Sequence, residues 1–251
     1  MTNSSLGKAL RRNLPLFSRG VRWAWAHRDS LAQIRSTYSQ NGEDRTVREA
    51  LESYDLKSGI YVDVGANQPS KISNTYLFYR LGCQGVLIEP NHELIRLLRR
   101  FRPRDIAIPV GCGERPALME FRHSNASVFG TFTNDVIEGQ RASEYLPILP
   151  LDLILEPIAC QWIFFLSIDV EGLDLEVLRG ATTALAKTLF LSIEYKSERS
   201  GMIDFLSKHS FVPFEETEHN LIFRSSNDFS AFQVPSGGGP QSQHSAPVRT
   251  P

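Results

Sequence analysis

Three carboxylate residues near the ends of two apolar segments are candidates for chemistry in this 251-residue chain. Asp169 lies at the end of the run "WIFFLSIDV" and Glu171 directly follows it, so the two project to the same side if the chain is extended there. Glu194 ends the next β-rich run. Such a cluster can take a proton from a hydroxyl, or it can hold a divalent cation such as Mg²⁺ that lowers the hydroxyl's pKa. A structural alternative is that Glu171 caps the following helix and Asp169 binds backbone amides.

A second set of candidates surrounds "YVDVGANQPS" at residues 61–70. Gly65 would let a ligand approach the backbone closely, and Asp63 suits a ligand with a positive centre. The chain lacks both GxGxxG and GxxxxGK[ST], so a pyrophosphate cradle is not supported. Glu89, at the end of the following β-rich run, is placed to accept hydrogen bonds from both ribose hydroxyls. Together these residues predict a cationic adenosyl ligand, S-adenosylmethionine; the alternative is a buried strand with a glycine turn.

The elements that must position these residues alternate between strands and helices. Short, nearly continuous β-rich runs are typical of strands buried on both faces. A helix with Asn91 as its cap follows the second of them, and further helices are predicted at 173–186 and 201–210. The alternation predicts a parallel sheet with helices on both faces and a ligand site at the carboxyl ends of its strands. The runs are 59–66, 85–90, 105–111, 162–170 and 189–195.

Two other segments shape the predicted domain. The runs 211–216 and 220–225 are joined by a short turn and predict a hairpin, so the sheet should end with an antiparallel strand. Residues 114–160 are too many for a simple crossover and are predicted to form a substrate-side insertion that begins with a small hairpin. Candidate acceptor-binding residues in this insertion are His123, Asn125 and Ser127.

The two ends of the chain differ in composition from the middle. Basic residues dominate 1–36, where Asp29 is the single acid, and Trp23 and Trp25 lie among them. This stretch predicts a helical extension, which either contacts a membrane surface peripherally or packs as a solvated helix on the domain. Residues 226–251 are rich in Ser, Gly and Pro and are predicted to form a disordered tail.

The composition excludes several classes of protein. With 27 basic and 28 acidic residues, the chain carries no excess charge for a polyanion, and no nucleic-acid partner is expected. No stretch approaches the roughly 18 apolar residues of a membrane span. Three scattered cysteines argue against a disulfide framework, and no secretory signal precedes the domain, so a cytoplasmic location is expected. The sequence does not indicate an oligomeric state.

Five stretches resemble one family in the same order along the chain, from Tyr38 to Arg224. They are "YSQNGEDRTV" (38–47), "GIYVDVGANQPSKISNTYLFYRLG" (59–82), "GVLIEPNHELIRLLRRFRP" (85–103), "NASVFGTF" (125–132) and "FLSIDVEGLDLEVLRG" (165–180). The chain is similar here to the FkbM family of S-adenosylmethionine-dependent methyltransferases. The resemblance implies a Rossmann-like class I methyltransferase fold over residues 37–225, with a mostly parallel seven-stranded sheet. It also implies methyl transfer, commonly to a hydroxyl of a sugar, a polysaccharide or a natural product.

The resemblance also implies roles for particular residues in cofactor binding. Asp63, Gly65 and Asn67 would line the methionine end, and Glu89 with Pro90 would hold the ribose. "PVGCGER" falls in the segment expected near the adenine, which makes Gly111 and Cys112 candidates. "SQNGED" implies that Gln40, Glu43 or Asp44 lies over the cofactor pocket, although Ser39 could instead start a helix.

Two other functions fit parts of the sequence. A non-catalytic methyltransferase-like module could bind the cofactor, or nothing, and act as a scaffold through its basic N-terminus. The acceptor could also be a nitrogen atom or RNA, but the (N/D)PP(Y/F) type of motif expected for nitrogen is absent from the fourth strand. The small-molecule or glycan hydroxyl is therefore the preferred acceptor.

Overall fold

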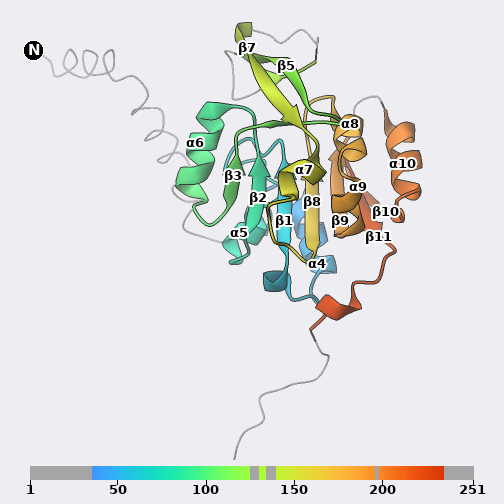
Figure 1. Cartoon of the computed structure of the whole chain (residues 1–251). Helices are drawn as coiled ribbons and strands as arrows, with labels where there is room; N and C mark the ends of the chain where they lie inside the picture. Colours follow the sequence, from blue (N-terminus) through green and yellow to red (C-terminus); the bar gives the residue numbers. More distant parts are fainter. Residues whose placement is uncertain (1–35, 125–129, 134–139, 196–197, 235–251) are drawn as a thin grey trace, which may run out of the picture.

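The computed structural model describes residues 36–124, 130–133, 140–195 and 198–234, and the fold is built on one seven-stranded sheet (Figure 1). The sheet has the strand order β10-β11-β9-β8-β1-β2-β3. Five neighbouring strands are parallel, and β11 pairs antiparallel with both β9 and β10. The predicted class I methyltransferase fold and its antiparallel last strand are confirmed. The strands are β1 (Ile60–Val64), β2 (Gly85–Ile88), β3 (Ile106–Ile108), β8 (Ile163–Ile168), β9 (Thr188–Glu194), β10 (Phe211–Glu216) and β11 (Asn220–Ser225).

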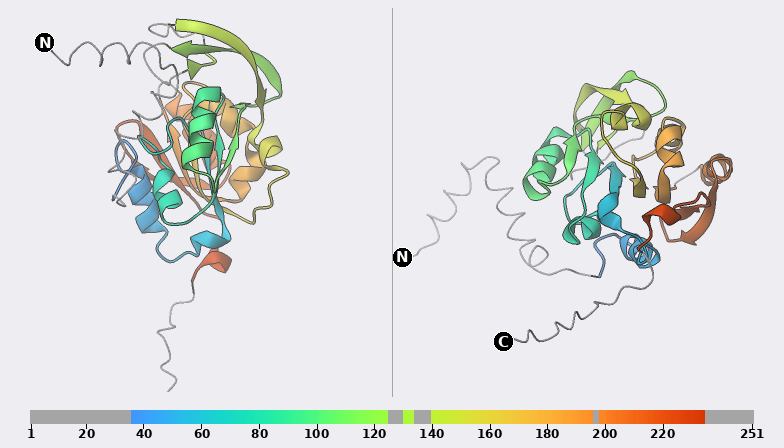
Figure 2. Two further views of the ribbon diagram at one scale, coloured as in Figure 1. Left: turned by 90° about the vertical axis from the view of Figure 1, so that its left-hand side faces the viewer. Right: turned by 60° about the horizontal axis from the view of Figure 1, so that its bottom comes forward.

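Helices cover both faces of this sheet, as the alternating pattern predicts (Figure 2). One hydrophobic cluster joins β1 and β8 to α7 (Leu151–Leu155), α8 (Asp174–Arg179), α9 (Thr182–Ala186) and α10 (Arg199–Ser207). The other cluster joins the opposite face to α4 (Glu43–Ala50), α5 (Tyr76–Arg80) and α6 (His92–Phe101). Every residue of β2 and β8 is buried, because both faces of these strands are covered.

Strand β1 lies where the direction of the chain order reverses. It pairs in parallel with β2 on one side and with β8 on the other. The crossovers that leave β1 and β8 therefore run in opposite directions, and this leaves a crevice beyond the carboxyl ends of these strands. Gly65 and Asn67 follow β1 at this point, and Asp169 and Glu171 follow β8.

The helices differ from prediction in one place and agree in another. Asn91 caps α6 as predicted, since its side chain accepts a hydrogen bond from the Glu93 N–H at 2.9 Å. The predicted helix over 173–186 is instead two helices, α8 and α9, with a break at Gly180. A Cβ atom at Gly180 would lie 2.2 Å from the carbonyl oxygen of Gly113, so the chain is closely packed at this break.

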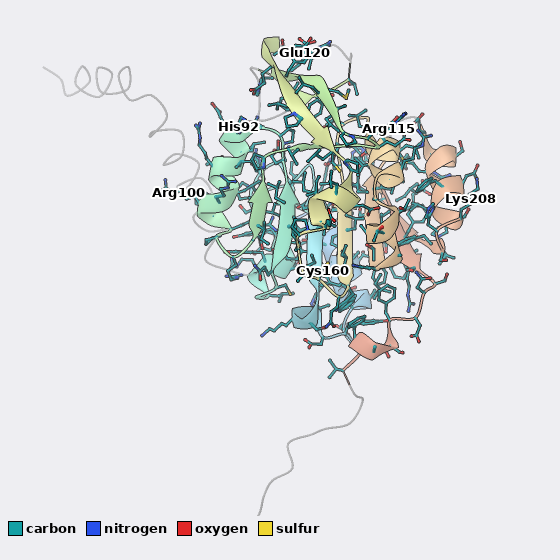
Figure 3. All side chains as sticks on the ribbon, viewed as in Figure 1. His92, Arg100, Arg115, Glu120, Cys160 and Lys208 are labelled. Carbon is teal, nitrogen blue, oxygen red and sulfur yellow. The ribbon has the colours of Figure 1, made fainter. Side chains whose placement is uncertain are left out.

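A second sheet of four strands forms most of the predicted insertion. It consists of β4 (Gly111–Cys112), β5 (Ala117–Ser124), β6 (Gly130–Thr131) and β7 (Gln140–Leu149), in the order β4-β7-β5-β6. The predicted small hairpin is thus a longer pairing of β5 with β7. The predicted strand at 105–111 is also divided, because Gly111 pairs with Ile148 of β7 rather than continuing β3. Figure 3 shows Glu120 of β5 at the outer end of this sheet.

The last part of the insertion belongs to the core. Leu151, Ile154 and Leu155 of α7 are buried in the cluster that covers β8. Asp152 accepts hydrogen bonds from the N–H groups of Thr183 and Ala184, at 2.9 and 2.8 Å. These contacts join α7 to the start of α9, so residues 151–155 support the sheet rather than the substrate side.

Residues 226–234 are not a disordered tail, which corrects the prediction for this part of it. Phe229 is buried, and the ring of Phe232 stacks on Trp162 with 4.7 Å between centroids. Val234 N–H donates to the carbonyl of Ser53 at 2.8 Å. The sequence pattern missed this packing because two aromatic residues suffice to fix a segment that is otherwise polar.

The ends of the chain lie outside the described residues. This applies to the predicted basic extension, apart from Ser36, and to residues 235–251 of the predicted tail. Within the described part of the chain, every helix is too short or too polar to cross a membrane.

Candidate active site

A cavity of about 270 Å³ opens beyond the carboxyl ends of β1, β2, β8 and β9. Residues of β5 and β6 in the second sheet also line it, so the insertion does border the predicted site. Residues that the sequence predicts for cofactor binding and for chemistry meet here. Those in the lining are Gln40, Asp63, Gly65, Asn67, Glu89, Pro90, Gly111, Cys112, Asp169, Glu171 and Glu194.

The turn after β1 requires glycine for two reasons. Gly65 has φ +83°, and a Cβ atom there would lie 1.8 Å from the backbone oxygen of Asp169. Hydrogen bonds join the same three strand ends: Gly65 N–H donates to Ile88 at 2.9 Å, and Asp169 N–H donates to Val64 at 2.9 Å. The turn therefore fixes the distance between the carboxyl ends of β1, β2 and β8.

Glu89 is a buried carboxylate held by backbone groups. Its side chain is 5% exposed, and its two oxygens accept hydrogen bonds from the N–H groups of Asn67 (3.0 Å) and Asn91 (2.8 Å). Burial raises the pKa of Glu89 to about 7, against the lowering effect of these hydrogen bonds. Each oxygen retains a lone pair for further donors, such as the hydroxyls of a ribose.

Asp63 is equally buried and is held by a side chain rather than by the backbone. The Thr75 hydroxyl donates to its Oδ2 atom, and the carboxylate borders the cavity. Burial raises the pKa of Asp63, whereas the positive charge of buried Arg102 lowers it. The sequence reading missed Thr75 and Arg102, because nothing in their local pattern indicates a contact with β1.

Two buried amide oxygens in the turn after β1 have no hydrogen-bond partner in the part of the chain that the structure describes. Among the described residues no donor contacts Asn67 Oδ1 or Gln68 Oε1, although both atoms are buried and both residues line the cavity. Buried polar atoms in folded proteins are normally hydrogen-bonded, so these oxygens fit a ligand that brings its own donors. An ammonium group with three N–H donors meets that requirement.

The three predicted catalytic carboxylates form a cluster on the other side of the cavity. One carboxylate oxygen each from Asp169, Glu171 and Glu194 lies within 4.8 Å of the others. Glu171 has φ +57° and Gly172 has φ +107°, so the loop between β8 and α8 turns sharply there. These oxygens are of the kind that Mg²⁺ binds in proteins, and they are also proton acceptors.

The sequence of the chain decides the family. Residues 63–213 match the profile described as the methyltransferase FkbM domain. The chain belongs to the FkbM methyltransferase family. The matched region runs from Asp63 in β1 to Pro213 in β10, and it contains the whole second sheet.

Comparison with solved structures finds methyltransferases that share 12–16% sequence identity with this chain. Methyltransferase FkbM from Methylobacillus flagellatus KT shares 16% identity with a TM-score of 0.48, over 74% of this chain and 48% of that one. The chain thus spans about half the length of that protein. A methyltransferase from Geobacter sulfurreducens shares 16% identity with a TM-score of 0.43, over 89% and 98% of the two chains. A TehB-like SAM-dependent methyltransferase from Corynebacterium glutamicum shares 12% identity with a TM-score of 0.40, over 83% and 99%. No curated protein matches the chain significantly.

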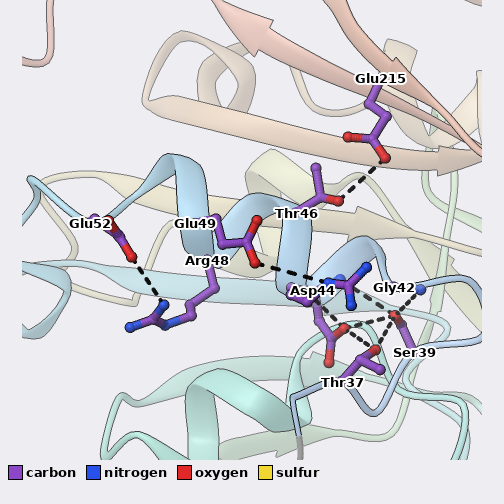
Figure 4. Close-up of polar contacts among 10 residues, drawn as sticks. Thr37, Ser39, Gly42, Asp44, Thr46, Arg48, Glu49, Glu52 and Glu215 are labelled. Atoms are coloured by element: carbon purple, nitrogen blue, oxygen red, sulfur yellow. Dashed lines mark hydrogen bonds and ion pairs between the residues drawn. The ribbon is translucent and has the colours of Figure 1, made fainter.

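The FkbM motif "SQNGED" contributes one residue to the cavity, and Figure 4 shows the polar contacts of its Ser39, Gly42 and Asp44. Gln40 lines the cavity, but Asp44 does not. The Asp44 carboxylate accepts hydrogen bonds from the Thr37 and Ser39 hydroxyls and from the Tyr38 N–H. Ser39 Oγ accepts from the Gly42 N–H at 3.1 Å, which agrees with a role in starting α4.

Glu43, predicted to bind the cofactor, lies outside the cavity lining. It is fully buried, and its Oε1 atom accepts hydrogen bonds from Thr217 (2.9 Å) and from the Asn220 amide (3.1 Å). These contacts fasten the start of α4 to the hairpin of β10 and β11. Glu43 is therefore a structural residue of the motif, and this corrects the prediction.

Of the acceptor-binding candidates in the insertion, His123 alone lies within the described residues. His123 lies outside the lining, and its Nε2 atom is 2.8 Å from Glu144 Oε1 across β5 and β7. Asn125 and Ser127 lie outside the described residues. The insertion instead lines the cavity with aromatic rings that sequence reasoning missed, Phe121 and Phe132, whose centroids are 4.8 Å apart.

Asp174 is a further missed residue, and it holds the loop that carries the acidic cluster. Its carboxylate accepts hydrogen bonds from the N–H groups of Val170 (3.2 Å) and Gly172 (3.1 Å). Burial raises the pKa of Asp174 to about 6. Asp174 thus binds the amides before α8. An acid in the first turn of a helix, just after a glycine loop, is the sequence signal that could have found it.

Proposed function

We propose that the protein is an S-adenosylmethionine-dependent O-methyltransferase whose acceptor is a hydroxyl of a sugar, a polysaccharide or a natural product. The observation that carries this proposal is the shared cavity. The glycine turn with Asp63 and Glu89 borders one side of it, and the cluster of Asp169, Glu171 and Glu194 borders the other. A cofactor site and a group of proton acceptors thus face the same space.

The residues of the β1 and β2 side fit the cofactor. Glu89 accepts hydrogen bonds from the ribose hydroxyls, and Asp63 with the amide oxygens of Asn67 and Gln68 accepts them from the ammonium group. Val110 and Cys112 border the cavity near Glu89 and offer apolar contact to the adenine. Bound there, S-adenosylmethionine supplies an electrophilic methyl group on a positively charged sulfur.

The acidic cluster supplies what a hydroxyl acceptor lacks. A neutral hydroxyl is a weak nucleophile, and its proton must leave as the new bond forms. One carboxylate of the cluster takes this proton, or the three together hold a divalent cation that lowers the pKa of the hydroxyl. Both roles also orient the acceptor, because a bound hydroxyl must point along the line of transfer.

The experiment is transfer of a radioactive methyl group from labelled S-adenosylmethionine to a panel of sugars, polysaccharides and hydroxylated natural products. We expect transfer to at least one member and its loss in Asp169→Asn. Loss of transfer in EDTA with recovery in Mg²⁺ identifies the cation mechanism, and indifference to EDTA identifies the general base. Transfer to RNA or to amines, with none to hydroxyls, would contradict the proposed acceptor class.

A further inference from the structure

The carboxylate of Asp63 is connected to a group of polar side chains that lie beneath the cavity. One of these side chains, Arg102, is fully buried and donates hydrogen bonds to two others, Asp105 and Thr75. Its Nε atom donates to Asp105 Oδ2 at 2.7 Å, and its Nη2 atom donates to Thr75 Oγ1 at 2.9 Å. Thr75, also fully buried, donates in turn to Asp63. A hydrogen-bonded chain therefore runs from Asp105 through Arg102 and Thr75 to the edge of the cavity.

The direction of the Thr75 hydroxyl in this chain is fixed by chemistry. A guanidinium group can only donate, so Thr75 Oγ1 must accept from Arg102. An ionised carboxylate can only accept, so the single hydroxyl proton of Thr75 must point to Asp63 Oδ2. Asp63 Oδ1 receives no hydrogen bond from the described residues and is left for a ligand.

Arg102 is itself held in place from several sides. Its guanidinium lies 5.4 Å from the ring centre of Tyr61 and 5.5 Å from that of Tyr79. Its partner Asp105 is fixed by the Tyr61 hydroxyl at 2.6 Å and by the Gly85 N–H at 3.0 Å. Because Tyr61 lies in β1 and Gly85 in β2, the arginine is anchored to the strands that border the cavity.

We propose that Thr75 and Arg102 are positioning residues: they hold Asp63 ionised and in one orientation, so that its Oδ1 atom can bind the ammonium group of the cofactor. This proposal rests on the proposed function, since it assumes that the cavity takes S-adenosylmethionine. It assigns binding energy to two side chains that do not line the cavity. The positive charge of Arg102 also opposes the effect of burial on the pKa of Asp63, which favours the ionised form.

The test is calorimetric titration of the full chain with S-adenosylmethionine, comparing wild type with Thr75→Val and Thr75→Ser. Valine matches threonine in shape but cannot donate, whereas serine keeps the hydroxyl. We expect Kd to rise about tenfold or more in Thr75→Val and to stay within about threefold in Thr75→Ser, because a hydrogen bond to a charged group is lost only in the first. If Thr75→Val does not fold, Thr75→Ala takes its place in the comparison.

A double-mutant comparison with Asp63 distinguishes a positioning role of Thr75 from a general effect on the structure. In an Asp63→Asn background, Thr75→Val should change Kd by less than about twofold, because the carboxylate on which Thr75 acts is gone. Thr75→Val should also regain affinity as the pH rises from 7 to 9, because the pKa of Asp63 is expected to be higher in this variant than in wild type. Ser58→Ala, which removes a hydrogen bond from Trp162 before the start of β1 and outside this network, should lower thermal stability without changing Kd.

The possible failures point to different conclusions. If wild type binds neither S-adenosylmethionine nor S-adenosylhomocysteine, the proposed function fails, and the positioning role fails with it. If wild type binds and Thr75→Val binds equally tightly, the positioning role alone is overturned. An equal loss of affinity from Thr75→Val with and without Asp63 would overturn it as well.

Discussion

The two halves of the cavity both present carboxylates, but they hold them in different environments. On the β1 and β2 side, Asp63 and Glu89 are each 5% exposed, and hydrogen bonds from neighbouring groups fix their orientation. On the β8 and β9 side, three acids crowd within 4.8 Å of one another. Under the proposed function, the carboxylates of the first half would bind the cofactor, and those of the second would take a proton or hold a cation.

The difference follows from the local backbone. Glu89 accepts from the N–H groups of Asn67 and Asn91, which the tight turn after β1 and the start of α6 direct toward it. Between β8 and α8, Asp174 accepts the loop amides. Asp169 and Glu171 of the same loop line the cavity. Substitutions in the two halves should separate affinity from rate.

The largest effect is expected from Asp169→Asn in the acidic half. Its amide can neither take the proton nor ligate a cation as a carboxylate does, so kcat should fall by about 10²- to 10⁴-fold. Affinity for S-adenosylmethionine should stay within about threefold of wild type. Labelled-methyl transfer and calorimetry measure the two quantities. Glu120→Gln, at the outer end of the second sheet, is the matched control. Equal losses in rate and affinity would remove the distinction between the halves.

Glu89→Ala should have the opposite effect. Loss of the ribose acceptor should weaken binding of S-adenosylmethionine by about 10- to 100-fold, because hydrogen bonds to a charged group are lost. Single-turnover rates at saturating cofactor should change much less. Glu93→Ala, an exposed acid in the adjacent helix, should leave the affinity unchanged. A variant that binds like wild type would show that Glu89 does not contact the ligand.

The pH dependence of affinity should be carried by Glu89. Its pKa is about 7 in the ligand-free protein, and hydroxyl donors favour the ionised form. Binding therefore requires loss of a proton at low pH, so affinity should increase about tenfold per pH unit below 7 and level off above it. Calorimetry from pH 5.5 to 8.5 measures this slope. A Glu89→Gln variant should have a flat profile, and an equally steep one would assign the slope to another group.

The same group should affect folding stability in the opposite sense. The pKa of Glu89 is higher in the folded chain, about 7, than its ordinary 4.5, so the folded state binds more protons between these values. Stability should therefore fall as pH rises through this range. From pH 4 to 8, the free energy of unfolding of Glu89→Gln should improve relative to wild type by about 3 kcal/mol. Urea denaturation at several pH values tests this, and a constant difference would contradict it.

The smallest effect concerns backbone strain. Ile72 lines the cavity with φ +52°, a conformation that a β-branched residue rarely adopts, whereas Ser210 has φ +65° and is not part of the lining. Glycine at either position should raise the free energy of unfolding by about 1 kcal/mol. Only Ile72→Gly should alter methyl transfer, because only Ile72 borders the cavity. Equal activity of both variants would show that the strain at Ile72 has no functional role.

Much of the fold could be predicted from the sequence, because it depends on local signals. The apolar runs of β1, β2, β8 and β9, the cap at Asn91 and the hairpin of β10 and β11 are all visible in short stretches. The second sheet could not be predicted in full, since the pairing of Gly111 with Ile148 depends on residues far apart in the chain. The packing of Phe232 on Trp162 was hidden for the same reason.

The candidate site divides in the same way. Asp63, Gly65, Glu89 and Asp169 follow strand ends, and the rule for parallel sheets places such residues together. The network beneath Asp63 could not be predicted, because Thr75 and Arg102 meet only after α5 and α6 pack on the sheet. The motif alone also led to the wrong place for Glu43, because its partners Thr217 and Asn220 lie near the other end of the domain in sequence.

The most direct measurement is calorimetric titration of the purified chain with S-adenosylmethionine and S-adenosylhomocysteine, repeated with Glu89→Ala. Micromolar binding by wild type, weakened by 10-fold or more in the variant, is the predicted result, because the adenosyl ligand then depends on the carboxylate after β2. Absence of binding by the folded wild-type protein, or equal binding by the variant, would contradict the assignment of this cavity to the cofactor.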